Sequence, residues 1–225
     1  MMDQSVKDHI KWSQHWSNLD TVARVRSSFL SMIRRKVIAK SVGKFIEHHF
    51  SPQGVYLHAG SGTAESDLFI NKYNRRFIAV DLVQKPLLVA RNQPNSYMCM
   101  VADIKHLALK DQCVDGIWNV GVHEHFSPQE NGTIFKEFLR VLKPKGKLII
   151  FWPGMFTPYM LLKDGLEFLW RLYRPGFRFF PEEINKARSK SHIKSELERA
   201  GFRILSISLS QYDLFVFYAA VAEKP

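Results

Sequence analysis

The feature that most restricts the fold of this chain is a regular alternation of short apolar runs with helical segments. Runs rich in β-branched and aromatic residues predict strands, and apolar residues that recur every three or four positions predict helices. The strand-like runs occupy residues 55–59, 76–80, 96–101, 115–120 and 147–152, with helical patterns between them at 85–93 and 128–142. Strands that alternate with helices need crossover connections, so the sequence predicts an α/β fold with a doubly wound, mostly parallel sheet.

The two ends of the chain depart from this rhythm. Residues 22–50 have the apolar spacing of an amphipathic helix, and a charged helix near the C-terminus ends at about Ala200. Two strand-like runs follow it, at 202–209 and 213–221. Because the connection between these runs is short, they must pair antiparallel. The sequence therefore predicts a terminal hairpin that follows the parallel part of the sheet.

Composition limits the class of protein. A length of 225 residues with 46% hydrophobic content suits one domain, and the two cysteines, Cys99 and Cys113, form neither a disulfide framework nor a metal-binding pair. We interpret both as core residues in a reducing compartment. The chain has no secretory signal pattern and no apolar run of membrane-spanning length, so a cytoplasmic location is expected.

The formal charge of +11 is compatible with an anionic partner such as nucleic acid, a phosphorylated small molecule or a membrane surface. The basic residues gather at 24–44 and 171–194. Solvated helix faces are the simpler interpretation of both clusters, because charge runs usually lack a specific partner. The first cluster has no interleaved aromatic residues, so nucleic acid is not favoured, although RNA binding stays open.

A glycine turn follows the first strand-like run. Gly60 and Gly62 lack the β-carbon that would keep a ligand away, and a helix that begins near Thr63 would direct unpaired amide donors at the same place. The GxxxxGK[ST] phosphate loop is absent, and the dinucleotide-binding pattern requires a third glycine where Glu65 stands. The turn by itself therefore indicates an anionic or polar ligand without naming it.

Two acidic residues lie at the ends of the next two strands. Asp81 follows Gly62 by 81 − 62 = 19 residues, where a carboxylate can accept both hydroxyls of a ribose. Asp103 ends the third strand and should lie over the same crevice. The alternative, that Asp81 only ends a strand, stays open. A nucleoside ligand at the strand ends is the favoured interpretation.

Five segments, taken in order, resemble motifs of the class I S-adenosylmethionine-dependent methyltransferases, and the type 11/25-like group in particular. They are HAGSGTA, AVDLVQKPLLVAR, VADIKHLAL, VDGIWNVGVHEHF and FKEFLRVLKPKGKLII. The resemblance implies a seven-stranded sheet with an antiparallel last strand and S-adenosyl-L-methionine as cofactor. It also suggests how one domain, 1–225, is organised: a helical cap (1–50), a cofactor-binding core (54–152), an insertion or lid with a helix (153–200) and a terminal hairpin (201–225).

The resemblance assigns cofactor contacts to individual positions. Glycine-turn residues would approach the methionyl and ribose parts, Asp81 would bind the ribose hydroxyls, and Leu82 would pack on adenine. The full set is His58, Gly60, Ser61, Gly62, Asp81, Leu82, Asp103, Ile104, Asn119 and Val120. Asp103 and the Ile104 amide would read the adenine edge, and Asn119 with Val120 would line the methionyl side.

Three positions depart from the family pattern: His58 replaces an acid that helps to hold the methionyl ammonium, Ala64 replaces a third glycine, and Lys145 replaces a common glycine. A neutral imidazole at position 58 could accept a hydrogen bond, whereas a protonated one would repel the ammonium. A buried strand histidine with its own partners is the alternative interpretation of His58.

Methyl transfer from a sulfonium is an in-line displacement, so the protein mainly aligns the reacting atoms. His123, Glu124 and His125 follow the fourth strand and are candidate catalytic residues, with His125 or Glu124 favoured as general base. They could also be turn residues with their own hydrogen bonds. No metal is predicted, because two imidazoles make a sparse site and a further carboxylate found in a related pattern is replaced by Gly121.

The acceptor is expected to be a small molecule. The [DN]PP[YF] motif of exocyclic-amine methylation is absent after the fourth strand, and neither cysteine follows a proline as cytosine C5 methylation requires. The aromatic-rich insertion 153–180 predicts a lid over an apolar or aromatic acceptor, with Arg171, Arg174 and Arg178 attracting an anionic end, although plain packing is an equal alternative. Trp12, His15 and Trp16 could likewise close over the cofactor.

Two other functions stay open: an RNA or protein methyltransferase that is guided by the basic faces, and a cofactor-binding but inactive regulatory subunit. The oligomeric state cannot be inferred from the sequence.

Overall fold

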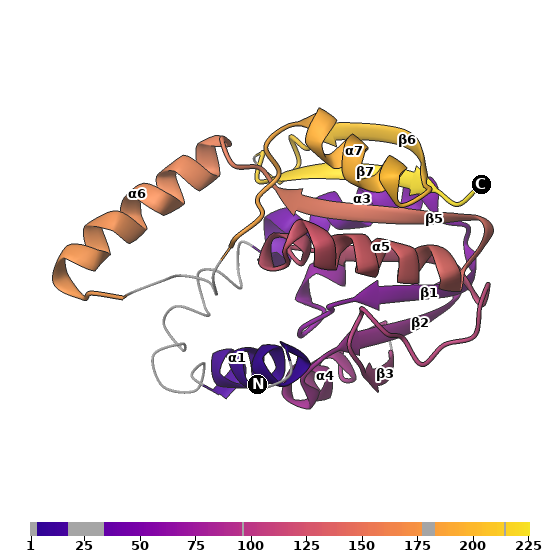
Figure 1. Ribbon diagram of the computed structural model, residues 1–225. Coiled ribbons are helices and arrows are strands. Elements are labelled where there is room, and N and C mark those ends of the chain that lie inside the picture. Colours follow the sequence, from indigo (N-terminus) through magenta and orange to yellow (C-terminus); the bar gives the residue numbers. More distant parts are fainter. Residues whose placement is uncertain (1–3, 18–33, 96, 177–182, 214) are drawn as a thin grey trace.

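A computed structural model describes residues 4–17, 34–95, 97–176, 183–213 and 215–225 (Figure 1). A seven-stranded sheet with the order β3-β2-β1-β4-β5-β7-β6 forms its centre. The strands are β1 (Gln53–Ala59), β2 (Asn74–Asp81), β3 (Met98–Val101), β4 (Val114–Val120), β5 (Leu142–Pro153), β6 (Arg203–Leu209) and β7 (Phe217–Glu223). The five strands β1 to β5 pair parallel, and β7 runs antiparallel to both β5 and β6. The predicted doubly wound sheet and its antiparallel last strand are confirmed.

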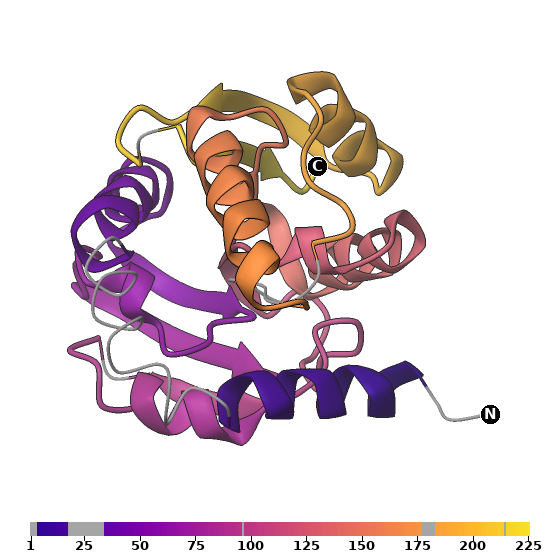
Figure 2. The same cartoon turned by 90° about the vertical axis from the view of Figure 1, so that its left-hand side faces the viewer.

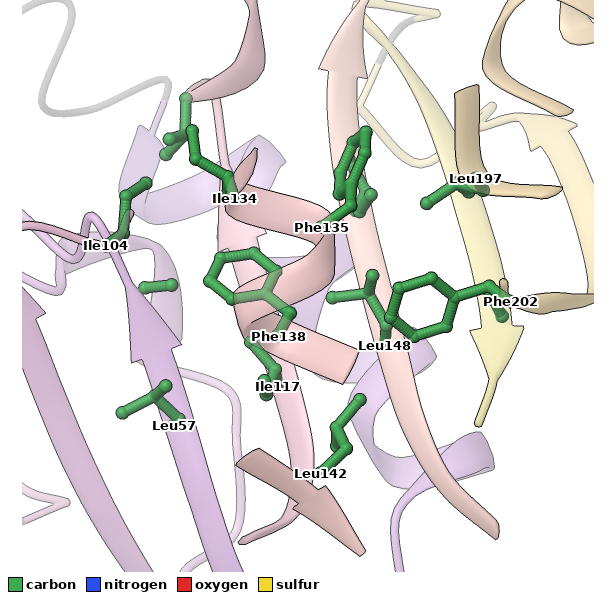
Figure 3. Close-up of a cluster of buried hydrophobic side chains, with 14 of the residues drawn as sticks. Leu57, Ile104, Ile117, Ile134, Phe135, Phe138, Leu142, Leu148, Leu197 and Phe202 are labelled. Carbon is green, nitrogen blue, oxygen red and sulfur yellow. The ribbon is translucent and has the colours of Figure 1, made fainter. Parts of the chain in front are cut away.

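Helices cover both faces of the sheet. Their bounds are α3 (Ala39–His49), α4 (Gln84–Ala90), α5 (Pro128–Val141) and α7 (Lys190–Arg199). Side chains of α5 and α7 pack against one face, where Leu57, Ile117 and Leu148 point, as Figure 3 shows. Side chains of α3 and α4 pack against the other face, where the strand neighbours Tyr56, Trp118 and Ile149 point. Because side chains alternate along a strand, buried apolar runs of this kind build two cores, one on each face.

The helix α5 shows how local sequence sets a boundary. Ser127 caps it: the Ser127 hydroxyl accepts from the Glu130 amide at 3.3 Å, while the Glu130 carboxylate accepts from the Ser127 amide at 3.0 Å. This reciprocal capping box satisfies amide donors that the first helical turn leaves unpaired. Pro128 fits the first helical position because it has no amide hydrogen to lose. The helix therefore begins directly after the turn that carries the candidate catalytic residues.

Several predicted boundaries shift at the ends of elements, and two differences involve more than such a shift. The break predicted at 143–146 lies inside β5, as a bulge where Lys145 has a positive φ of 64°. The amphipathic pattern of 22–50 is helical from Arg34 onward, through a short π-helical stretch (Arg34–Ile38) and α3, and its part at 22–33 lies outside the described residues. Neither difference changes the order or direction of the strands.

Two further helices, α1 (Gln4–Ser17) and α6 (Pro158–Tyr173), lie at the edge of the sheet where β1 to β4 end (Figures 1 and 2). The helix α1 runs across this edge, whereas α6 projects from the body of the molecule. Within the described residues no helix is long and apolar enough to cross a membrane.

Candidate functional site

A cleft lies at the carboxyl ends of β1 to β4, where the strand order reverses between β1 and β4. In a doubly wound sheet, helices that connect the strands on either side of this point go to opposite faces, which leaves a crevice between them. Figure 2 views the molecule from this edge, with α1 below and α6 above. Nine of the ten predicted cofactor-binding residues border the cleft; Asn119 does not.

The glycine turn forms one wall. Gly60 has φ 65°, and a β-carbon there would lie 2.8 Å from a Val122 methyl group, so a side chain at this position would force a shift. Gly62 has φ 52°, and its added β-carbon would lie 3.3 Å from the Trp16 ring. The Ser61 amide donates to the Val80 carbonyl at 2.9 Å and ties the turn to β2. The turn can therefore approach a ligand as closely as the sequence predicts.

The sequence predicts a helix after this turn, and the predicted length is wrong. Only a three-residue 3₁₀-helix, Glu65–Asp67, follows, because Ala64 takes a left-handed conformation with φ 55°. A right-handed α-helix that begins near Thr63 cannot continue through a residue with that backbone conformation. The amide donors near the ligand are thus those of the turn itself, without the dipole of a full helix behind them.

The acidic residues lie side by side across the second and third strand ends. Asp81 accepts from the Gly62 amide at 2.9 Å through Oδ2 and from the Val83 amide at 3.0 Å through Oδ1. Burial raises the pKa of Asp81, while these two amides oppose the shift. Asp103 accepts from the Lys105 amide at 2.9 Å through Oδ1. Both carboxylates are held at the cleft, with Leu82 and Ile104 beside them, as a nucleoside site requires.

Two predicted residues at the end of β4 lie behind the cleft. His123 and Asn119 are fully buried, and neither borders the cleft. The His123 ring donates from Nδ1 to Asn131 Oδ1 at 2.7 Å and accepts at Nε2 from Asn119 Nδ2 at 2.7 Å. Burial lowers the pKa of His123 to about 4. The structure therefore places the His123 and Asn119 side chains behind the cleft, where they hydrogen-bond to each other.

Glu124 and His125 do border the cleft, together with Val120. His125 Nε2 lies 3.7 Å from Glu124 Oε1, and the imidazole meets the Trp12 ring edge-on with centroids 5.0 Å apart. Amides of Ile184 and Asn185 donate to the Glu124 carbonyl at 2.7 and 3.0 Å, which fixes this turn against the chain that precedes α7. The two side chains are therefore held where a general base would face the ligand. His123 and His125 lie on different sides of the turn and do not face a common metal.

The helix α1 supplies a wall that no motif indicates. Asp8, Trp12, His15 and Trp16 border the cleft, as the sequence suggests for the three aromatic residues. Lys105 anchors this helix, because its Nζ lies 3.0 Å from Asp8 Oδ2. The same ammonium contacts Glu130 at 3.3 Å. Asp8 and Lys105 were missed by sequence reasoning, since they are 97 positions apart and neither belongs to a recognisable pattern.

The position of His58 is buried and paired. Its side chain is 1% exposed, and Nδ1 lies 2.6 Å from Asp67 Oδ2. Asp67 was also missed by sequence reasoning, because its approach to β1 depends on the left-handed backbone of Ala64.

The described part of the predicted lid is mainly the helix α6. Of the described side chains of α6, Met160 borders the cleft, while Phe168 and Tyr173 are 63% and 85% exposed. The helix begins at the Thr157 cap, whose hydroxyl accepts from the Met160 amide, and it then leads away from the body. Arg171 pairs with Glu167 on the same helix, and Arg178 lies outside the described residues. Among the described side chains of α6, no cation borders the cleft. Cys99, predicted as a core residue, is exposed on β3.

Comparison with known proteins agrees with the geometry. Residues 57–150 match a family model described as a methyltransferase domain. No curated protein matches the chain. The fold is similar to that of 1,6-didemethyltoxoflavin-N1-methyltransferase from Burkholderia thailandensis, which was crystallised with 1,6-didemethyltoxoflavin and S-adenosylhomocysteine: the TM-score is 0.67 at 15% identity over 100% of this chain and 92% of that one.

Two other solved structures show the same likeness. Magnesium protoporphyrin IX methyltransferase from Synechocystis PCC 6803, with bound S-adenosylhomocysteine, has a TM-score of 0.63 at 14% identity over 97% of this chain and 95% of that one. An S-adenosylmethionine-dependent methyltransferase from Methanosarcina mazei has a TM-score of 0.62 at 16% identity, over 80% and 96%. At such low identity the likeness is one of fold, and the acceptors that the names of the first two proteins indicate differ from each other.

Proposed function

We propose that this chain transfers the methyl group of S-adenosylmethionine to a small-molecule acceptor, because residues 57–150 match a methyltransferase-domain model and the fold is similar to those of methyltransferases. S-adenosyl-L-methionine is the cofactor of the proposal, since two of the similar structures hold its demethylated product, S-adenosylhomocysteine. The observation that supports the proposal best is the cleft itself, where a close-approach turn and two fixed carboxylates meet on neighbouring strand ends.

The cofactor fits these residues group by group. Asp81 keeps lone pairs for the two ribose hydroxyls after it has accepted the Gly62 and Val83 amides. Leu82 offers an apolar surface to the adenine ring, and Asp103 with the Ile104 amide offers an acceptor and a donor to its edge. Gly60 and Gly62 leave room for the sugar and the methionyl chain. When bound, the cofactor supplies a methyl group on a sulfonium, which is already a good leaving group.

The acceptor side of the cleft is bordered by aromatic and apolar side chains. Trp12, Met160 and Phe217 border it together with His125 and Glu124. An apolar or aromatic acceptor would be desolvated by these walls, and His125 or Glu124 would remove its proton as the nucleophile attacks in line. The anionic end predicted for the acceptor stays part of the proposal; of the arginines that suggested it, Arg171 pairs with Glu167 and Arg178 lies outside the described residues.

A binding experiment tests the cofactor site. Calorimetry should show that wild-type protein binds S-adenosylhomocysteine and that Asp81→Ala binds it at least about a hundredfold more weakly, since hydrogen bonds to a charged group contribute roughly 1.5–3 kcal/mol each and two are lost. Asp111→Ala is the matched control, because Asp111 is 72% exposed and pairs with Arg140 outside the cleft. Equal affinity of wild type and Asp81→Ala would remove the basis of the proposed site.

Transfer itself is tested with radiolabelled cofactor and a cell extract that is afterwards separated into metabolites, RNA and protein. Label in the metabolite fraction supports a small-molecule acceptor. Label in RNA or protein would favour the alternative acceptors, and binding without any transfer would indicate an inactive regulatory subunit.

We also propose a cytoplasmic location, supported by two cysteines that are both free thiols.

A further inference from the structure

A buried carboxylate lies directly behind the imidazole that stands where the related family has an acid. Asp67 is 1% exposed, and its Oδ2 lies 2.6 Å from His58 Nδ1. In the sequence these residues are nine positions apart, on β1 and on the 3₁₀-helix after the glycine turn. The left-handed backbone of Ala64 folds the chain back so that Asp67 reaches the strand.

Asp67 is held by donors from several elements. Oδ1 accepts from Trp118 Nε1 at 3.2 Å and from the Ser66 hydroxyl at 3.0 Å, and Oδ2 accepts from the Tyr97 hydroxyl at 2.6 Å as well as facing His58. Burial, and then the Asp67 charge, raise the pKa of Tyr97 well above its ordinary value, so the phenol stays a donor. These donors satisfy the oxygens of a side chain that is closed off from water.

The imidazole connects Asp67 to the cleft. One ring face stacks on Trp118, with centroids 4.8 Å apart and planes 27° from parallel, so the ring cannot turn freely. Because Asp67 takes Nδ1 and His58 borders the cleft, Nε2 is the ring nitrogen that is left to meet a ligand. A histidine whose Nδ1–H donates to a carboxylate presents a lone pair at Nε2 and becomes a stronger acceptor there.

We propose that His58 and Asp67 together form the subsite for the methionyl ammonium group, with His58 Nε2 as its hydrogen-bond acceptor and Asp67 as the source of the compensating negative charge. The inference rests on the proposed function, since it concerns the same cofactor. In this arrangement Asp67 takes the place of the family's acid, one imidazole ring farther from the cleft. His58 touches the ligand in this arrangement, and Asp67 is a positioning residue that acts through it.

Glu124 is the rival candidate, because its carboxylate also borders the cleft. The two sites make different predictions about which substitution removes the preference for a ligand that carries an ammonium group. That preference is measured as the ratio of affinities for S-adenosylhomocysteine and 5′-methylthioadenosine, which has the same nucleoside but lacks the amino-acid end.

Calorimetry on the full chain tests the proposal. Asp67→Asn should weaken binding of S-adenosylhomocysteine about tenfold or more, as expected for the loss of a charge-assisted bond, and change binding of 5′-methylthioadenosine by less than about twofold. The double variant His58→Asp, Asp67→Asn moves the acid to the strand position and should recover the affinity for S-adenosylhomocysteine to within about threefold of wild type. His58→Asp alone puts two carboxylates in contact and should not recover it.

Each outcome decides the question. Equal loss of both ligands in Asp67→Asn would mean that Asp67 only supports the fold, and selective loss in Glu124→Gln instead would assign the ammonium to Glu124; either result overturns the proposal. If Asp67→Asn does not fold, as judged by its melting temperature, His58→Asn must show the same selective loss. Failure of the wild type to bind either ligand would refute the proposed function, whereas equal wild-type affinity for both would refute this inference alone.

Discussion

The buried histidine of the β4 turn makes the stability of the protein depend on pH in a way that can be calculated. Burial lowers the pKa of His123 from 6.5 to about 4 in the folded chain. Below pH 6.5 the unfolded chain takes up a proton that the folded chain refuses until about pH 4, so the free energy of unfolding falls as the pH falls. For one group with these two pKa values the loss between pH 7 and 4.5 is about 2 kcal/mol.

The variant His123→Gln isolates this contribution. Glutamine does not titrate, and its amide can keep one hydrogen bond to Asn119 or Asn131, so the fold should persist with a stability at pH 7 lower by roughly 1–3 kcal/mol. Urea unfolding at pH 7, 5.5 and 4.5, followed by far-ultraviolet circular dichroism, gives the free energy of unfolding of each protein. The wild type should lose about 2 kcal/mol more than the variant over this range.

When the pH dependence of the free energy of unfolding is compared between the two proteins, the contributions of the other titrating groups cancel, because both proteins contain those groups. His106→Gln is the control, because His106 is exposed and its removal should leave the slope unchanged. Parallel wild-type and His123→Gln curves would refute the description of His123 as a sealed neutral imidazole. The variant should also bind S-adenosylhomocysteine like the wild type, since the ring lies behind the cleft.

Two further substitutions test other groups. Burial raises the pKa of Asp213 from 3.8 to about 6. The contribution of Asp213 to the free energy of unfolding is therefore present below pH 3.8 and is lost as the pH rises to 6. Compared with wild type, Asp213→Asn should have a free energy of unfolding that is more favourable by about 1–3 kcal/mol at pH 7.5 than at pH 4, measured by urea unfolding. An unchanged difference between the two pH values would contradict this. His125→Ala should lower kcat about a hundredfold while the affinity for S-adenosylhomocysteine stays within about threefold, as expected for a general base. A parallel loss of kcat and affinity would instead make His125 a binding residue.

The parts of the fold that follow from short-range periodicity could be predicted from the sequence. Buried strands such as 55–59 and the helix at 128–142 have spacing that few other structures satisfy, and strand alternation forces the parallel crossovers. The bulge in β5 and the single 3₁₀ turn after the glycines could not be predicted. Both depend on left-handed backbone at Lys145 and Ala64, residue types that rarely adopt it and give no signal in a pattern.

The candidate site divides in the same way. Residues at strand ends, such as Asp81 and Asp103, could be placed because the carboxyl ends of parallel strands meet at one edge. The sequence could not show which side chains of the turn His123–His125 reach the cleft. It is a 3₁₀-helix, in which successive side chains point about 120° apart, so His123 enters the core while Glu124 and His125 reach the cleft. Sequence spacing alone does not fix that rotation.

The acids of the cleft show why motif comparison and chemistry give different answers. A motif is defined by residue types at fixed positions along the chain, and at position 58 the family's acid is absent. The electrostatics of a site depend on which charges lie near it in space, and Asp67 Oδ2 lies 2.6 Å from His58 Nδ1. In the same way α1 reaches the cleft through Asp8 and Lys105, which are far apart in the chain. If Asp67 supplies the charge as proposed, the substitution at position 58 does not by itself remove the subsite for the ammonium group.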